Sequence, residues 1–507
     1  MASEVESRLL LVSVFLVAAA GLVYELIAGT LATYLLGSSI TVFSIVIGVF
    51  MAAMGIGAWI AQYARRALAF WFVAAELALS LVGGLSALVL FASYVFFEGG
   101  FIVVLGMVCI SIGTLVGLEI PILLRIVESG SSVRLAVSRV LAVDYVGALL
   151  GSVLFPLVLL PYLGLVRTAA LLGLLNLVVA FVAIKLLQND LHAVRKLKAW
   201  GVVIGMILGV VFGTAGSTTS WAEDSLYQDP VVLSQSTPYQ RIVVTQWRDD
   251  VRLYLNGHLQ FSSMDEHRYH EALVHPALSA VEDPKRVLIL GGGDGLAVRQ
   301  VLAHGGVEHV DLVDLDPHLL KIFREHPALT VLNDDALDRP EVQLHAQDAI
   351  EFVDGTTERW DAIILDLPDP NDDTLSRLYA QSTFRLFLSR LSDAGVLVTQ
   401  ATSPFFAPDA FWCIVETLES VAGQHQSVRP YHLNVPSFGE WGFALVGPRE
   451  TQTPVLPGGL ATQFLDQNSL ASMFHFPKDL QRRDVEPNRL TTAVLVVYYR
   501  DGWKTFH

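Results

Sequence analysis

The sequence contains very little cysteine. Cys109 lies inside an apolar run and Cys413 lies far from it, and these are the 2 cysteines among the 507 residues. Two cysteines so widely separated exclude a disulfide framework and a cysteine-rich metal site.

Charged residues are also scarce, at 16% of the chain with a net charge of −16, whereas a soluble protein has about one quarter. Residues 1–216 contain 11 Lys and Arg and 9 Asp and Glu, so the remainder carries −18. This division excludes a single water-soluble globule, a disordered chain and a nucleic-acid binder with a basic surface. An acidic soluble part suits cationic small molecules, although acidity also serves solubility.

Seven apolar runs in the first 216 residues meet the length of about 20 residues that a membrane helix needs, a count that is uncertain by one. The first carries no obvious small-residue cleavage site and is interpreted as a retained helix, not a signal peptide. We therefore expect an α-helical, multi-pass domain in the cell membrane, in contact with the lipid bilayer. Its helices are predicted at about 9–29, 41–64, 67–97, 101–127, 141–164, 166–187 and 199–216.

Basic residues are concentrated in alternate connections, for example Arg65 and Arg66 after the second run and Lys196 and Lys198 before the last. The positive-inside rule places those connections and the N-terminus in the cytoplasm. Seven spans would then put the soluble part outside, whereas one uncounted or re-entrant segment would put it inside. The sequence leaves the side open.

Four carboxylates lie within or at the ends of the apolar runs: Glu25, Glu76, Glu119 and Asp144. Charges at membrane depth are costly and are functional candidates by default. One interpretation is a pathway or docking site for a cation, and the other is protonated or hydrogen-bonded residues that fix helix packing. The spacing of the glycines in these runs indicates close helix contacts at Gly55, Gly57, Gly113, Gly117, Gly147 and Gly151.

The soluble part begins with a strand-rich segment. Residues 240–247 and 251–255 alternate as strands do, and Asn256-Gly257 is typical of a tight hairpin turn. We predict a small β subdomain over 217–280 and an α/β Rossmann-like domain over 281–507. The helix that follows the strands is rich in His and Glu but lacks HExxH, so we expect no metal site there.

The segment 285–304 reads as strand, glycine turn and helix, with Gly291 to Gly295 at the turn. This is the first unit of a doubly wound nucleotide-binding sheet. The next strand ends at Asp314, where a carboxylate can hold two ribose hydroxyls. Asp294 inside the turn would repel a pyrophosphate and attract a cation, which favours an adenosyl sulfonium or amine over a dinucleotide.

Two further strands end in acids. The strand at 342–346 leads to Asp348, and the strand at 361–365 leads to Asp366 and Asp369, which are separated by Leu-Pro. Ligands lie at this edge of such a sheet. One carboxylate of the pair can hold a cation while the other accepts a proton.

Together these motifs carry a resemblance. Residues 227–507 resemble the spermidine synthase family of polyamine aminopropyltransferases, and the helical N-terminal part is similar to membrane-fused bacterial members. The matching pieces occur in the family's order: Tyr239-Gln240, 255–260, 265–271, 291–295, the strand to Asp314, 347–349, 366–370 and 439–443.

The resemblance implies a transfer of the aminopropyl group of decarboxylated S-adenosylmethionine, a co-substrate, to putrescine, which gives spermidine and methylthioadenosine without a prosthetic group or metal. It implies no nucleic-acid partner and admits a homo-oligomer formed through the catalytic domain. The residue roles that it implies are Asp366 as the base; Gln240, His270, Asp294, Asp314, Asp348 and Ala349 for the donor; and Tyr269 and Asp369 for the acceptor.

Three departures from the family pattern affect this expectation. Leu367-Pro368 replaces small hydroxyl residues, Ala349 replaces a common glycine, and 435–438 lacks the usual tyrosine. Two alternatives remain open at this point: an S-adenosylmethionine-dependent methyltransferase, and a membrane polyamine transporter or sensor with a ligand-binding soluble domain. Asp294 and the acid pair count against the first, and the base at Asp366 counts against the second.

Overall fold

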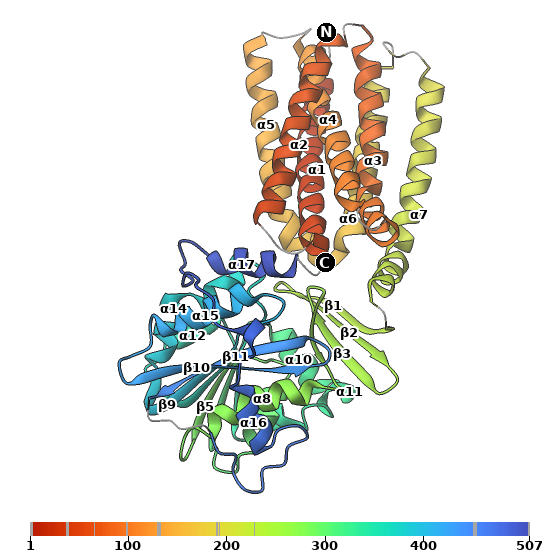
Figure 1. The fold of residues 1–507 in the computed structure, drawn as a ribbon. Coiled ribbons are helices and arrows are strands. Elements are labelled where there is room, and N and C mark those ends of the chain that lie inside the picture. The colour runs from red at the N-terminus through yellow and green to blue at the C-terminus, as the bar shows by residue number, and fades with distance from the viewer. Residues whose placement is uncertain are drawn as a thin grey trace. The chain divides into compact units, whose positions relative to one another are not determined.

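The computed structural model describes residues 4–36, 40–64, 66–97, 100–128, 133–188, 191, 193–227, 229–449 and 454–504. The chain separates into two compact units, Met1–Asp229 and Pro230–His507. The first unit is α-helical, and the second contains both strands and helices (Figure 1).

The first unit is built from long apolar helices that lie side by side (Figure 1). They are α1 Glu4–Leu36, α2 Ile40–Ile60, η1 Ala61–Tyr63, α3 Leu68–Phe96, α4 Phe101–Glu128, α5 Val133–Leu154, the π-helix η2 Phe155–Leu159, α6 Leu160–Leu186 and α7 Val194–Leu226.

Six stretches of the described residues are long and apolar enough to cross a membrane. The fifth, Val137–Leu186, covers the segment predicted at 141–164 and all but the last residue of the segment predicted at 166–187. Helical geometry is interrupted there at Gly164, with φ 70° and ψ 179°, a conformation that glycine adopts without steric cost. The last helix, α7, continues to Leu226, ten residues beyond the predicted end of the last apolar run at Gly216.

Small residues let the helices of this unit approach closely. A Cβ on Gly57 would lie 2.1 Å from the carbonyl oxygen of Thr114, and one on Gly117 would lie 2.1 Å from that of Met54. Gly113, Gly147 and Gly151 meet neighbouring backbone in the same way, whereas nothing lies within 4 Å of Gly55. The predicted role in helix contact is therefore confirmed for five glycines and wrong for Gly55.

The second unit begins with an antiparallel sheet in the order β1-β2-β3-β4. Its strands are β1 Val231–Ser236, β2 Arg241–Trp247, β3 Asp250–Leu255 and β4 His258–Ser262. Asn256 and Gly257 connect β3 to β4 with φ values of 52° and 84°, as the Asn-Gly signal predicts for a tight hairpin.

A seven-stranded mixed sheet follows, in the order β10-β11-β9-β8-β5-β6-β7. Strands β5 to β9 are parallel, and β10 and β11 form an antiparallel hairpin at the edge beside β9. The strands are β5 Arg286–Gly291, β6 His309–Asp314, β7 Val342–Ala346, β8 Trp360–Asp366, β9 Leu391–Gln400, β10 Gln426–Val435 and β11 Gly439–Pro448.

The second unit also contains helices, which cover both faces of this sheet. They are α8 Glu266–Leu278, α9 Leu296–Leu302, α10 Pro317–Glu325, α11 Pro327–Thr330, η3 Ala336–Asp338, α12 Ala349–Asp354, α13 Asp373–Ser376, η4 Arg377–Tyr379, α14 Gln381–Leu388, α15 Pro408–Glu419, α16 Gln467–Met473, η5 Lys478–Leu480 and α17 Val494–Trp503.

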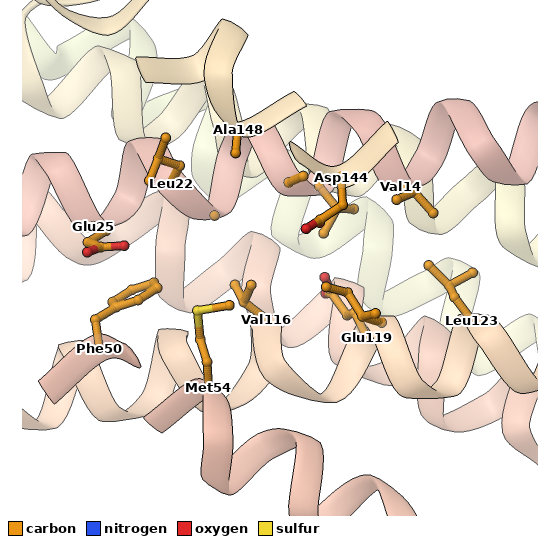
Figure 2. A pocket seen from close by; sticks show the side chains of 14 residues that line it. Val14, Leu22, Glu25, Phe50, Met54, Val116, Glu119, Leu123, Asp144 and Ala148 are labelled. Atoms are coloured by element: carbon orange, nitrogen blue, oxygen red, sulfur yellow. The ribbon is translucent and has the colours of Figure 1, made fainter. Parts of the chain in front are cut away.

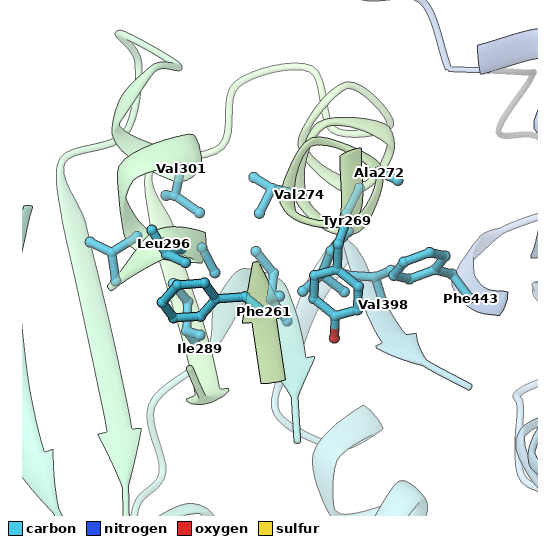
Figure 3. Close-up of a cluster of buried hydrophobic side chains, with 14 of the residues drawn as sticks. Phe261, Tyr269, Ala272, Val274, Ile289, Leu296, Val301, Val398 and Phe443 are labelled. Carbon is cyan, nitrogen blue, oxygen red and sulfur yellow. The ribbon is translucent and has the colours of Figure 1, made fainter. Parts of the chain in front are cut away.

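Alternate residues of the strands enter two separate cores. Ile289 and Val398 pack with α8 and α9 on one face, and Figure 3 shows them near Phe261 and Tyr269. Leu288 and Leu397 point to the other face, where they pack with α14 and α15. Because both faces are covered, the central strands are buried and read as continuous apolar runs.

Candidate active site

The carboxyl edge of the parallel strands gathers the predicted acids. Asp314 ends β6, Asp366 ends β8, and Asp348 follows β7. Asp294 lies in the turn after β5, and Asp369 lies three residues after the end of β8. Strand connectivity thus brings together acids that are distant in the sequence.

The glycine turn allows these acids to crowd together. Gly291 and Gly292 have φ values of 83° and 67°, which favour glycine. A Cβ on Gly291 would lie 2.1 Å from the carbonyl oxygen of Asp366, and one on Gly293 would lie 2.7 Å from Oδ2 of Asp314. Side chains at this turn would therefore displace the acids.

Asp314 is held by the backbone of its neighbours. Its Oδ2 accepts a hydrogen bond from the Gly293 amide at 3.1 Å, and its Oδ1 accepts one from the Asp316 amide at 2.8 Å. Burial raises the pKa of Asp314 to about 6, and these two bonds oppose the rise. Gln240 reaches the adjacent Asp316, to whose Oδ2 its Nε2 donates at 3.1 Å.

Asp348 and Ala349 begin α12. Oδ1 of Asp348 accepts hydrogen bonds from the amides of Ile350 and Glu351 at 2.8 and 3.2 Å, which caps the helix, and its Oδ2 pairs with Arg377. Both predicted residues lie at the carboxyl edge, with the carboxylate engaged in this cap.

Two side chains of α8, Tyr269 and His270, approach Asp366. The Tyr269 hydroxyl donates to Oδ1 of Asp366 at 2.9 Å, and Nε2 of His270 lies 3.9 Å from its Oδ2. Nδ1 of His270 contacts Oε2 of Glu266 at 2.8 Å, and Arg299 donates to Oε1 of Glu266 at 2.7 Å. Arg299 and Glu266 thus orient the imidazole toward Asp366.

These contacts also shift the pKa values of Asp366 and His270. Burial raises the pKa of Asp366, while His270 and Tyr269 oppose this. Burial lowers the pKa of His270, but the carboxylates of Glu266 and Asp366 outweigh it and raise that pKa. A protonated imidazole is therefore stabilised next to the acids.

Asp294 completes a cluster with His270 and Asp366. Each of the three residues offers one atom that could bind a cation, and these three atoms lie within 4.8 Å of one another. Burial raises the pKa of Asp294 to about 7, with the nearby Asp366 adding to the rise and His270 opposing it. Such a cluster can hold an ammonium group or a metal ion, and the prediction of a metal-free site stays a prediction.

Asp369 accepts hydrogen bonds from two hydroxyls that the sequence did not predict. Tyr499 of α17 donates to its Oδ2 at 2.9 Å, and Thr402 approaches the same atom at 3.4 Å. Burial raises the pKa of Asp369 to about 6, with Tyr499 opposing.

Hydrogen bonds to the backbone hold the Leu-Pro pair between the two acids in place. The Tyr379 hydroxyl donates to the Pro368 carbonyl at 3.0 Å, and Nε2 of Gln400 donates to the Leu367 carbonyl at 2.9 Å. Gln400 ends β9, so its place at a strand end was a usable signal. The sequence contains no such signal for Tyr379 and Tyr499, because neither residue belongs to a motif around the acids.

Fold and site together define a Rossmann-like α/β enzyme with an acidic site at the carboxyl edge of its sheet. Residues 266–453 match the family model described as spermine/spermidine synthase domain. A polyamine aminopropyltransferase of Leptospira interrogans is 45% identical over 97% of this chain and 98% of its own length. Polyamine aminopropyltransferase 2 of Ralstonia nicotianae is 46% identical over 98% of each chain.

A crystal structure of spermidine synthase in complex with the transition-state analogue AdoDATO aligns with 49% of this chain and 88% of its own. Its TM-score is 0.46 at 23% identity. The relatives above place the chain in the spermine/spermidine synthase family, as an enzyme of the polyamine aminopropyltransferase type.

Proposed function

We propose that the second unit transfers the aminopropyl group of decarboxylated S-adenosylmethionine, the co-substrate of this family, to an amine of putrescine. The amine nitrogen forms a bond to the aminopropyl carbon next to sulfur. The carbon–sulfur bond breaks, and its electrons neutralise the sulfonium to give methylthioadenosine. The attacking nitrogen gives up one proton to become a neutral amine before the attack, and the secondary ammonium group that the attack forms belongs to the product, spermidine.

Asp366 is the proposed base. A diamine is protonated at neutral pH, so a proton must leave the attacking nitrogen before it can form a bond. The raised pKa of Asp366 suits it to accept that proton, and the Tyr269 hydroxyl holds one of its oxygens in place. This half-buried, hydrogen-bonded carboxylate at the end of β8 is the observation that carries the proposal.

The donor is assigned to the glycine turn and the neighbouring strand ends. We assign the ammonium group of the donor to Asp294, its ribose to Asp314, and its adenine to Asp348 and Ala349. Gln240 and His270 are assigned to further donor atoms. Asp294 is buried and Asp314 is half-buried, and loss of solvent raises the pKa of both carboxyl groups. This supports the assignments, because a cationic ligand favours the charged form of such carboxylates.

The acceptor is assigned to Tyr269 and Asp369. The second hydroxyl on Asp369 comes from Tyr499, a donor that could serve in place of the tyrosine that 435–438 lacks. A carboxylated sulfonium donor would bring its own carboxylate toward Asp294, which counts against methyl transfer.

The test is incubation of the purified full chain with putrescine and each sulfonium donor in turn, scoring spermidine and methylthioadenosine. Asp366→Asn should lower kcat by about 10²–10⁴-fold, while Asp373→Asn, which changes an exposed acid at the start of α13, should leave it unchanged. Methylation by the carboxylated donor, or binding without turnover, would reject the proposal.

Dialysis against EDTA should leave the rate unchanged, because the proposed chemistry uses carboxylates and no metal. Loss of activity that Mg²⁺ or Zn²⁺ restores would instead assign the cluster of His270, Asp294 and Asp366 to a metal ion.

We also propose that the first unit lies in a lipid bilayer. It exposes large apolar side chains such as Met51, Ile102, Leu149, Trp200 and Val210, each more than 60% exposed. Exposure of this many apolar side chains in water marks an aggregation-prone surface, whereas in a bilayer it is the expected lipid-facing surface. Membrane fractions that resist an alkaline carbonate wash should retain the chain, and release by that wash would contradict the proposal.

A further inference from the structure

The first unit contains a cavity of about 100 Å³ between α1, α2, α4 and α5. Three carboxyl side chains line it, from Glu25, Glu119 and Asp144, and the rest of its lining is apolar. A buried water needs about 10–15 Å³ measured in the same way. The cavity therefore has room for a ligand of several non-hydrogen atoms.

Glu119 lies in this cavity without a partner. It is 0% exposed, and neither of its carboxyl oxygens has a hydrogen-bond partner among the described residues. No described lysine or arginine lies within ion-pair distance of Glu25, Glu119 or Asp144. A buried carboxylate without a partner is costly, and a bound cation would relieve that cost.

The three acids are spread along the cavity. Figure 2 shows Glu25 toward one end and Glu119 with Asp144 farther along, before Val14 and Leu123, with Met54 and Val116 between the two acidic positions. The metal-type cluster found among the described residues is the one in the second unit. The cavity acids therefore do not converge on one point, as ligands of a single metal ion would.

Helix packing gives the spacing. A Cβ on Gly21 would lie 3.1 Å from Val116, and α1 and α4 run in opposite directions (Figure 1). Glu119 is therefore near the level of Ala18, seven residues from Glu25, or about 10 Å at the rise of an α-helix. Two anionic positions with an apolar stretch between them match ammonium groups joined by methylene groups.

We propose that this cavity binds a polyamine lengthwise, with one ammonium group at Glu119 and Asp144 and another at Glu25. The choice of ligand rests on the proposed function, since putrescine and spermidine are its acceptor and product. Putrescine and spermidine both carry ammonium groups joined by methylene groups. Separate binding measurements with each show which of the two the cavity binds. The apolar contacts of Phe50, Met54 and Val116 would face the methylene chain.

The test measures equilibrium binding of radiolabelled putrescine and, separately, spermidine to the full chain in lipid nanodiscs. An Asp369→Asn background weakens the acceptor site of the second unit, so that the remaining binding reports the cavity. In that background Glu119→Gln should weaken the remaining binding roughly tenfold or more, and so should Asp144→Asn. In an otherwise unchanged chain, Glu119→Gln should leave the aminopropyltransferase rate unchanged, which shows that the chain is folded.

Glu76→Gln is the matched control, because Glu76 is equally buried in α3 but does not line the cavity. Its polyamine binding should persist. Unchanged binding in Glu119→Gln and Asp144→Asn, equal loss in Glu76→Gln, or binding of Na⁺ with no polyamine binding would overturn the proposal. None of these outcomes bears on the catalytic assignment, which depends on product formation.

Discussion

At the residue scale, the acidic site of the second unit holds several carboxylates largely out of contact with water, and His270 is the cationic side chain beside Asp294. The pKa values of Asp294, Asp314 and Asp369 are raised by burial to about 7, 6 and 6. The substrate-free site is therefore less stable than an uncharged one of the same shape, which is a common cost of a functional site.

Replacing Asp294 by Asn should stabilise the substrate-free protein at pH 8. The folded-state pKa is raised from 3.8 to about 7, so the folded chain binds the extra proton. The contribution of Asp294 to the free energy of unfolding is therefore fully present below about pH 4 and is lost as the pH rises through about 7. We expect a gain of roughly 1–2 kcal/mol at pH 8 in the variant and almost none at pH 4. Asn can still accept the Leu296 amide bond.

Thermal unfolding at the two pH values measures this difference, with exposed Asp373→Asn as the control. An equal effect at both pH values would contradict the buried-charge explanation.

Tyr499→Phe removes the hydroxyl that donates to Asp369. A hydrogen bond to a charged group contributes about 1.5–3 kcal/mol, so the KM for putrescine should rise by roughly tenfold or more while the KM for the donor is unchanged. Steady-state kinetics with each substrate varied separately measures this split. The matched control is Tyr498→Phe, on the adjacent residue, and an equal change in both KM values would reject the assignment to the acceptor side.

Single residues were predictable where a motif ends a strand. Asp314 and Asp366 end apolar runs and Asp348 follows a predicted strand, so their place at the sheet edge could be inferred, and the Asp294 turn follows β5. Glu266 and Arg299 were not recognised, because their role depends on packing of α8 against α9. Tyr499 was missed because it lies 130 residues from Asp369.

At the element scale, the turn after β5 sets how closely the strand ends approach. Gly291→Ala should greatly lower donor affinity or unfold the unit, because its Cβ would overlap the Asp366 carbonyl at a φ of 83°. A positive φ alone costs a non-glycine residue about 1–2 kcal/mol. Binding of methylthioadenosine and the unfolding temperature report the two effects.

Gly305→Ala is the control for this change, since nothing lies within 4 Å of a Cβ there. Normal ligand affinity and stability in Gly291→Ala would show that β8 can move away from the turn.

The elements of the second unit were predictable where local patterns are strong. The runs at 285–290, 309–314, 342–346 and 361–365 were all expected as strands, and each is one. The order of the sheet and its antiparallel edge, β10 and β11, required tertiary pairing that no local pattern encodes. In the first unit, helical segments were predicted from apolar length, and Gly164 divides the longest one.

At the scale of the whole molecule, the two units have separate interiors. Two hydrophobic clusters contain only residues of the second unit, and two others contain only residues of the first. A unit with its own core is able to fold alone. A chain of residues 230–507 should therefore be monodisperse and retain aminopropyl transfer, measured by product formation beside the full chain in detergent.

Aggregation or inactivity of that fragment would show that the helical unit is required for folding or catalysis. Polyamine binding at the proposed cavity should be absent from the fragment in either case.

The buried acids of the catalytic unit also predict an exchange of protons with the solvent. Near neutral pH, Asp294 in the empty site is partly protonated, and a cationic substrate favours its charged form. Binding should therefore release hydrogen ions, so the calorimetric heat of donor binding at pH 7 should vary with the ionisation enthalpy of the buffer. Each catalytic cycle would then load and unload a proton at the turn after β5, separately from the proton that the amine gives up.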